Sequence, residues 1–416
     1  MQVNKQQRGA WKQNSWSTPR YICSFAGLLI AISHNTASAE SKTGFLPFAS
    51  FSHTYDSNLL NRPNQGVGAA PQSDQINRFE FGTHINFQLS RQQFSGMVSF
   101  SDSRHAEFEE RNVQGNAYRL RWDSEIGKTL VLAVEGSAIS DQAPIQTGQV
   151  LAVERDQDNL TSSLTWNFHP EYAVLSQISR TETRFLGPEN SNNITFADLN
   201  RDDELASIGL EFHPGTGSSI AILQKKSSGN FPIRQITGPM QSVSNDFDQN
   251  ETELLTKWNY SEITTVKLSL SSVQREHREM PARDFSGSNY RLELLYKPTE
   301  KTSFTASWAK QIIGISDVTN SDALARQFFL SMNMQVASKT MFRLGYLPQK
   351  LQFDGTDGLS TQARTEKLKE TSLNIEHKLT ERATLGALLR NRSRDSSLSN
   401  ADYSANSFSV FVKYEY

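Results

Sequence analysis

The last nine residues, Phe408-Ser-Val-Phe-Val-Lys-Tyr-Glu-Tyr416, decide the fold class of this chain. Successive side chains of a β-strand point to opposite faces. One face is therefore apolar and rich in aromatic rings: Phe408, Val410, Val412, Tyr414 and Tyr416. The reverse face is polar except at one position: Ser409, Phe411, Lys413 and Glu415. A strand that closes a membrane β-barrel faces lipid on one side and a wet lumen on the other, so the segment predicts such a strand. An edge strand of a soluble protein is the alternative.

This segment also resembles the C-terminal recognition signal of bacterial outer-membrane proteins. That signal ends in an aromatic residue, with apolar residues at every second position before it. The resemblance implies that the apolar face from Phe408 to Tyr416 is the assembly signal. It also implies that the barrel-assembly machinery is a partner of the chain.

The first 39 residues have the three parts of a secretory signal peptide. Lys5, Arg8, Lys12 and Arg20 form a basic start, an apolar stretch follows over 21–32, and Ala37-Ser-Ala39 precedes Glu40. The apolar stretch is about 12 residues long, whereas a spanning helix needs about 20. We therefore expect a signal peptide over 1–39, export through the general secretory route, and a single barrel domain over 40–416.

Composition agrees with an outer-membrane protein. Only 37% of the residues are apolar, which leaves no window that reads as a membrane helix but suits strands with apolar residues at alternate positions. The single cysteine, Cys23, lies in the leader, so the mature chain forms no disulfide. Four of the 42 Lys and Arg residues also lie in the leader, which leaves 38 against 44 Asp and Glu, a net charge of −6. This acidic balance gives no support for a nucleic-acid partner.

Alternating strands recur along the rest of the chain. Residues 79–89, 118–126, 164–168, 290–296 and 328–336 each place apolar and aromatic residues on one face and polar residues on the other. Eight short turns separate pairs of strands, near Arg91, Lys128, Pro170, Pro214, Ser261, Pro298, Ser338 and Thr380. Nine longer polar stretches lie between them, near 58–75, 103–116, 141–157, 187–202, 227–250, 278–288, 316–325, 354–366 and 391–403.

This alternation of short and long connections is typical of an outer-membrane barrel, with short periplasmic turns and long extracellular loops. The sequence therefore predicts an all-β, antiparallel transmembrane β-barrel of about 18 strands (roughly 16–20) in the Gram-negative outer membrane. A soluble β-sandwich or propeller would also give strands and turns. It would not require repeated lipid-like faces, and outer-membrane lipid is the expected surrounding.

No catalytic pattern is recognisable in the sequence. Gly-x-Ser-x-Gly, a phosphate-binding loop and His-Glu-x-x-His are all missing, and the histidines are scattered. Residues 245–250 could hold calcium through clustered oxygens, but they lack the spacing of a known loop and are read as a hydrophilic outer loop. We expect a protein that is not an enzyme and that has no metal site and no cofactor.

The charged residues of the polar faces are the candidate substrate-contacting positions. Charges facing lipid near the midplane would cost about 2–4 kcal/mol each, so these residues are expected to face the lumen: Arg119, Arg121, Asp123, Glu125, Arg291, Glu293 and Arg343. Because both signs occur, a simple charged selectivity ring is not expected. The alternative is that these side chains pair across neighbouring strands and only hydrate the wall.

Size then points to transport. Barrels of about 16–18 strands leave an aqueous channel unless they are plugged, and the first strand is expected near Phe45, shortly after the leader. A passive conduit, a general diffusion porin, and a structural or surface-interaction barrel with an occluded lumen all remain possible.

The first predicted strand adds a family resemblance. Residues 45–63 contain Tyr55, Asp56, Asn58 and Leu59, followed by Arg62-Pro63. This segment resembles the opening of EpsL-type, exosortase-B-associated exopolysaccharide proteins, within a broader group of β-barrel porins. Asn61 departs slightly from that pattern. The resemblance implies exopolysaccharide biosynthesis or export, with polysaccharide and export-complex proteins as partners. Asp56 and Asn58 also suit a strand end where side chains cap backbone groups.

Overall fold

The structure is a computed structural model of the chain. It describes residues 43–64, 70–143, 153–187, 196–238, 241–317, 320–353, 363–398 and 401–416. The predicted signal peptide and its cleavage before Glu40 lie outside the described residues. Among the described residues, no helix is long and apolar enough to span a bilayer.

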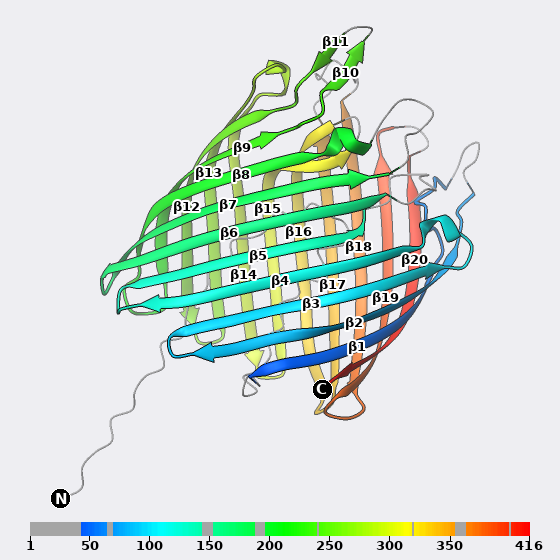
Figure 1. Cartoon of the computed structure of the whole chain (residues 1–416), viewed down its shortest axis with the longest axis horizontal. Coiled ribbons are helices and arrows are strands. Elements are labelled where there is room, and N and C mark those ends of the chain that lie inside the picture. The colour runs from blue at the N-terminus through cyan, green and yellow to red at the C-terminus, as the bar shows by residue number, and fades with distance from the viewer. Residues whose placement is uncertain are drawn as a thin grey trace, which may run out of the picture.

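Eighteen antiparallel strands form one closed sheet (Figure 1). In chain order they are β1 (Gly44–Asp56), β2 (Asp74–Leu89), β3 (Gln92–His105), β4 (Val113–Ile126), β5 (Leu130–Gln142), β6 (Glu154–His169), β7 (Tyr172–Leu186), β8 (Arg201–Phe212), β9 (Ser219–Asn230), β12 (Phe247–Ser261), β13 (Thr264–His277), β14 (Phe285–Thr299), β15 (Thr302–Asp317), β16 (Asn320–Ala337), β17 (Thr340–Phe353), β18 (Arg364–Lys378), β19 (Ala383–Ser396) and β20 (Tyr403–Glu415).

Each strand pairs with the next along the chain, and β1 pairs with β20 to close the barrel. Two short strands, β10 (Gln235–Gly238) and β11 (Gln241–Val243), form a separate hairpin between β9 and β12. In Figure 1 this hairpin projects beyond the rim that carries the long connections. Among the described residues, the remaining elements are three short 3₁₀ turns: η1 (Glu109–Arg111), η2 (Phe196–Leu199) and η3 (Pro281–Arg283).

The predicted strand number and the asymmetry of the two rims are confirmed. The predicted loop limits are wrong at several places, because strands continue into these polar stretches. The clearest case is 316–325, where β15 reaches Asp317 and β16 begins at Asn320. Likewise, β12 begins at Phe247, β6 at Glu154, and β19 continues to Ser396.

The physical reason is that the barrel wall extends past the lipid. Beyond the apolar band the outward residues of the strands become polar, so the lipid-facing alternation ends although the ladder of hydrogen bonds continues. Near the 316–325 connection, buried apolar side chains pack together on the inner face of the strands: Ile313, Ala323, Ala325, Leu351, Phe353 and Leu368.

The closing strand has the predicted orientation. Phe408, Val410, Val412 and Tyr414 are between 39% and 48% exposed on the outer face. Phe411 points inward and covers Gly386 of β19, where a Cβ atom would lie only 2.1 Å from the Phe411 ring. The apolar exception in the terminal segment therefore fills the space that a glycine leaves on the neighbouring strand.

Aromatic rings on the outer face gather near the periplasmic turns, including Phe94, Trp122, Trp166, Phe168, Tyr172, Trp258, Tyr260, Tyr296 and Tyr414. A second set lies further up the strands, including Phe79, Phe81, Phe100, Tyr118, Trp308, Phe328 and Tyr346. Two aromatic girdles with an apolar band between them are expected of a barrel that crosses a membrane. The chain is an outer-membrane β-barrel.

Candidate functional site

The inner wall of the barrel is the candidate site. All seven predicted positions face inward, because they alternate with lipid-facing residues such as Tyr118, Leu120, Leu292 and Leu344. The structure does not gather them into one site. Four lie on β4, two on β14 and one on β17.

Most of these charges are paired along the wall. Arg121 donates two hydrogen bonds to the carboxylate of Asp123, at 2.7 and 2.6 Å, and a third at 3.4 Å to Glu135 on β5. Arg119 lies 3.9 Å from Glu135. These side chains remain partly exposed, at 47% for Arg119 and 39% for Arg121.

The charges on β14 and β17 follow the same rule. Glu293 forms an ion pair with Lys267 of β13 at 2.9 Å. Arg291 donates a hydrogen bond to the side-chain oxygen of Gln311 of β15 at 3.2 Å. Arg343 pairs with Glu376 of β18. Arg119, Arg291, Glu293 and Arg343 therefore contact charged or polar side chains on neighbouring strands. Arg121 contacts Asp123 on its own strand as well as Glu135 on β5.

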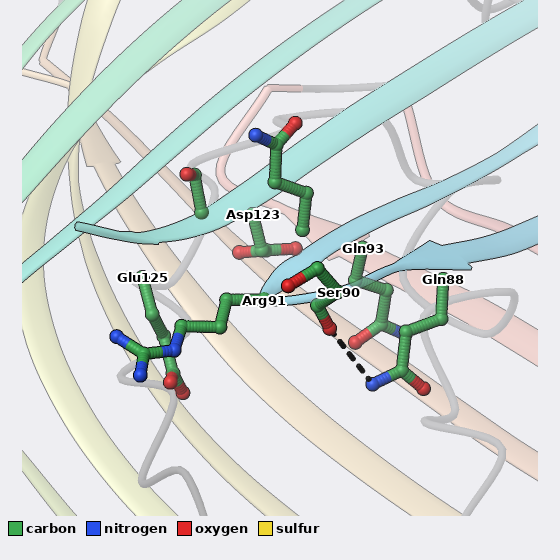
Figure 2. Close-up of a pocket in the computed structure, with 8 residues that line it drawn as sticks. Gln88, Ser90, Arg91, Gln93, Asp123 and Glu125 are labelled. Carbon is green, nitrogen blue, oxygen red and sulfur yellow. Dashed lines mark hydrogen bonds between the residues drawn. The ribbon is translucent and has the colours of Figure 1, made fainter. Parts of the chain in front are cut away.

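Asp123 and Glu125 also line a polar hollow of about 290 Å³ at the periplasmic ends of β2, β3 and β4. Figure 2 shows Arg91 reaching into it from the β2–β3 turn. The guanidinium of Arg91 donates to the carbonyl oxygen of Gly127 at 2.7 Å, which ties this turn to the next one. The hollow therefore belongs to the hydrated periplasmic rim of the wall.

A second charged region, not predicted from the sequence, lies near the extracellular end of β18 and β19. Arg390, Arg392 and Arg394 occupy alternate positions of β19 and face inward. Arg394 pairs with Glu366 at 2.6 Å, and Arg390 with Glu370 at 3.4 Å. The alternation Arg-Asn-Arg-Ser-Arg is visible in the sequence, but the polar composition of 391–403 predicts a loop there.

Arg392 reaches farther than its neighbours. Its Nη2 atom lies 2.6 Å from Oδ2 of Asp56 on β1, so the side chain crosses β20. The residue of β20 opposite Arg392 is Ala405, which is 1% exposed. A small residue at this position leaves room for the arginine, and we call the contact between Asp56 and Arg392 the cross-seam pair.

The residues of the EpsL-like segment, Tyr55, Asp56, Asn58 and Leu59, lie at the extracellular corner of the same seam. Oδ1 of Asp56 accepts from the backbone N–H of Asn58 at 2.9 Å. Asn58 is fully buried, and its side-chain amide donates to the carbonyl oxygens of Arg62 and Ser404. Leu59 is buried, whereas Tyr55 points outward and is 44% exposed. These contacts are structural and join the first loop to the last strand.

The motif's departure at Asn61 has a conformational reason. Its φ angle is 50°, in the left-handed region that asparagine tolerates better than most residues.

The predicted absence of catalytic and metal chemistry can be compared only with the described residues. Among them, no group of three or more His, Cys, Asp and Glu residues is placed to hold a metal. The candidate calcium stretch divides instead. Asn245 accepts a hydrogen bond from Arg283, the Asp246 carboxylate caps the N–H of Phe231 at 2.7 Å, and the residues from Phe247 onward belong to β12.

No known family model and no curated protein matches the sequence. Among solved structures, the chain is similar to the outer membrane protein opdK of Pseudomonas aeruginosa, with 10% identity, a TM-score of 0.47, and coverage of 89% of this chain and 99% of that one. A BenF-like porin from Pseudomonas fluorescens Pf-5 gives 10% identity and a TM-score of 0.49, over 89% and 99% of the two chains.

The siderophore receptor PirA of Acinetobacter baumannii gives 8% identity and a TM-score of 0.48, over 91% and 81% of the two chains. These similarities do not indicate a function, which is inferred below from the residues of the inner wall.

Proposed function

We propose that this barrel is an outer-membrane channel for small polar solutes. The observation that carries the proposal is the inner wall: charged and polar side chains line it along the strands, and many remain partly exposed. A barrel of about this strand number is wide enough for an aqueous lumen. Removing charged groups from water carries a desolvation cost, so partly exposed ion pairs along the inner wall suit a wet lumen.

The paired wall also predicts how solutes would pass. Arginines bound to neighbouring carboxylates lie along the wall and present a mixed, hydrated surface. Such a surface lowers the cost of moving a polar solute without selecting strongly for one sign of charge. We therefore propose a diffusion channel with weak ion selectivity.

Export of an exopolysaccharide, with export-complex proteins as partners, is the second candidate. It rests on the resemblance over residues 45–63, within which Tyr55, Asp56, Asn58 and Leu59 match the family pattern. The buried positions of Asp56 and Asn58 account for their residue types through folding alone, so the motif adds little to this reading. A polysaccharide conduit would show interruptions of ion current when a polymeric saccharide is added.

The test is conductance in planar lipid bilayers. The purified barrel should open steady pores, and Arg119→Ser with Arg121→Ser should assemble normally but shift the selectivity toward cations. The shift follows because Glu135 and Asp123 lose their cationic partners.

The matched control is Arg180→Ser with Arg184→Ser, two arginines on the outer face of β7, which should leave selectivity unchanged. Wild-type protein that folds but gives no pores would contradict the channel proposal. Unchanged ion selectivity in the Arg119 and Arg121 variant would mean that these arginines have only a structural role in the barrel wall.

A further inference from the structure

Four cations form a continuous row on the outer surface of the barrel. The strand register places Lys310 of β15 opposite Arg326 of β16, Arg326 opposite Lys350 of β17, and Lys350 opposite Lys367 of β18. We call these four residues the basic row. Adjacent strands lie about 4.8 Å apart, so the row spans roughly 14 Å.

The row faces away from the lumen. Neighbours in sequence point inward and are buried, including Ala309, Ala325, Leu351 and Glu366. Arg326, Lys350 and Lys367 are exposed, as is Lys369 just below the row. Trp308 and Phe328, on the same outer face, are 53% and 39% exposed. The basic row therefore lies directly above lipid-facing aromatic rings.

Its height matches the outer boundary of the membrane. On β16, the outward residues from Val336 to Phe328 are apolar, and Arg326 is the next outward residue. Ten residues at about 3.3 Å each, on a strand tilted by about 40°, rise roughly 25 Å. This is the height of the apolar band of an outer-membrane barrel, about 25 Å. Arg326 therefore lies where lipid tails end and headgroups begin.

Within the described part of the chain, one carboxylate lies beside the row: Asp395 of β19 is opposite Lys367 in the strand register. No described residue forms an ion pair or a hydrogen bond with any of the four side chains. Like charges directly opposite each other on neighbouring strands are destabilising. By contrast, Arg184 on the outer face of β7 pairs with Glu182 and Asp202, both at 2.7 Å. An anion bound from outside the chain would reduce the repulsion between the cations of the row.

We propose that the basic row binds the phosphate groups of lipid A, the phosphorylated glycolipid of the outer leaflet. The argument combines charge complementarity with height: Arg326 lies at the level of the lipid headgroups, and the neighbouring cations of the row repel one another until an anion lies between them. Anionic headgroups attract Lys and Arg at a membrane surface. Acyl chains of the same lipid can pack against Trp308 and Phe328 below the row.

The test compares two matched double variants of the full mature barrel, purified in detergent and checked for folding by heat-modifiable migration on gels. The first, Arg326→Gln with Lys350→Gln, removes the centre of the row. The second, Arg180→Gln with Lys226→Gln, removes one arginine and one lysine from the outer faces of β7 and β9. Binding is measured by native mass spectrometry with bisphosphorylated lipid A, with lipid A stripped of both phosphates, and with inorganic phosphate as competitor.

We expect the Arg326 and Lys350 variant to bind bisphosphorylated lipid A about thirtyfold more weakly, because two cations near an anionic surface are lost. The Arg180 and Lys226 variant should stay within about twofold of wild type. Removing the phosphates from lipid A should weaken wild-type binding to the level of the Arg326 and Lys350 variant, and millimolar inorganic phosphate should not compete.

Several results would overturn the proposal. Equal losses in both variants would make the effect a matter of overall charge, and undiminished binding of dephosphorylated lipid would remove phosphate as the ligand. Competition by inorganic phosphate would make the row a site for free anions. A changed oligomeric state with unchanged lipid affinity would make it a contact between copies of the chain.

Discussion

The cross-seam pair allows a quantitative test of how the barrel is closed. Asp56 and Arg392 meet at 2.6 Å across β20, and their side chains are 8% and 26% exposed. Asp56→Asn keeps the shape of the side chain and the Oδ1 atom that caps Asn58 at 2.9 Å. It replaces the Oδ2 acceptor that Arg392 binds with an amide NH2 group, so both the charge and the hydrogen bond to Arg392 are lost.

The exposed fractions set the expected magnitude. A hydrogen bond between charged groups contributes about 1.5–3 kcal/mol when it is shielded from water, whereas an exposed pair contributes about 1 kcal/mol or less. Because Asp56 is nearly buried, we expect Asp56→Asn to lower the free energy of unfolding by about 2 kcal/mol. Arg121→Gln, at a pair whose arginine is 39% exposed, should cost about 1 kcal/mol or less.

The assay is urea-induced unfolding of the barrel in lipid vesicles, followed by tryptophan fluorescence, in a double-mutant cycle. Arg392→Gln added to Asp56→Asn should cost little more than either change alone, since both remove the same contact. The reasoning is refuted if Asp56→Asn costs no more than Arg121→Gln. It is also refuted if the two substitutions in the cycle are additive within about 0.5 kcal/mol.

Three further predictions concern the closing strand, its glycine contact and the outer loops. Deleting Tyr414 to Tyr416 removes the last pairings with β1 and the 3.0 Å hydrogen bond from Tyr416 N–H to Pro47. Each unpaired backbone group costs several kcal/mol in lipid, so assembled barrel should vanish from outer-membrane fractions on immunoblots, and normal assembly would contradict this reading. Gly386→Ala places a Cβ atom 2.1 Å from the Phe411 ring and should destabilise the barrel by about 1–3 kcal/mol through overpacking. Phe411→Ala in the same chain should restore part of that loss in urea unfolding, and no rescue would mean that the contact does not matter. In the loops, the hydrogen bond from Arg234 lowers the pKa of the Glu279 carboxyl. The contact therefore stabilises the folded loops fully at pH values above the ordinary glutamate pKa. This stabilisation is lost as the pH falls through the lowered pKa of Glu279. Corrected hydrogen exchange of the β10–β11 hairpin should therefore rise at acid pH in wild type but not in Glu279→Gln, and equal pH profiles would disprove the link.

Much of the fold could be predicted from local pattern. Alternation in segments such as 79–89 and 328–336 fixes which side chains face lipid, because a one-residue slip would turn every charge into the membrane. The inward orientation of Arg119, Arg121, Arg291 and Arg343 followed from that rule alone. Strand ends beyond the lipid could not be found in this way, and β15, β16 and β19 all run into predicted loops.

The sequence by itself determined the class of the molecule: a closed barrel with a polar interior, because the cost of charge in lipid acts on each strand separately. Only the tertiary structure decided which charges meet. Arg392 and Asp56 are 336 residues apart and become partners through closure of the sheet. Lys310, Arg326, Lys350 and Lys367 become one row through the register of four strands. Register and closure depend on pairing between distant segments, and no local window of sequence contains that information.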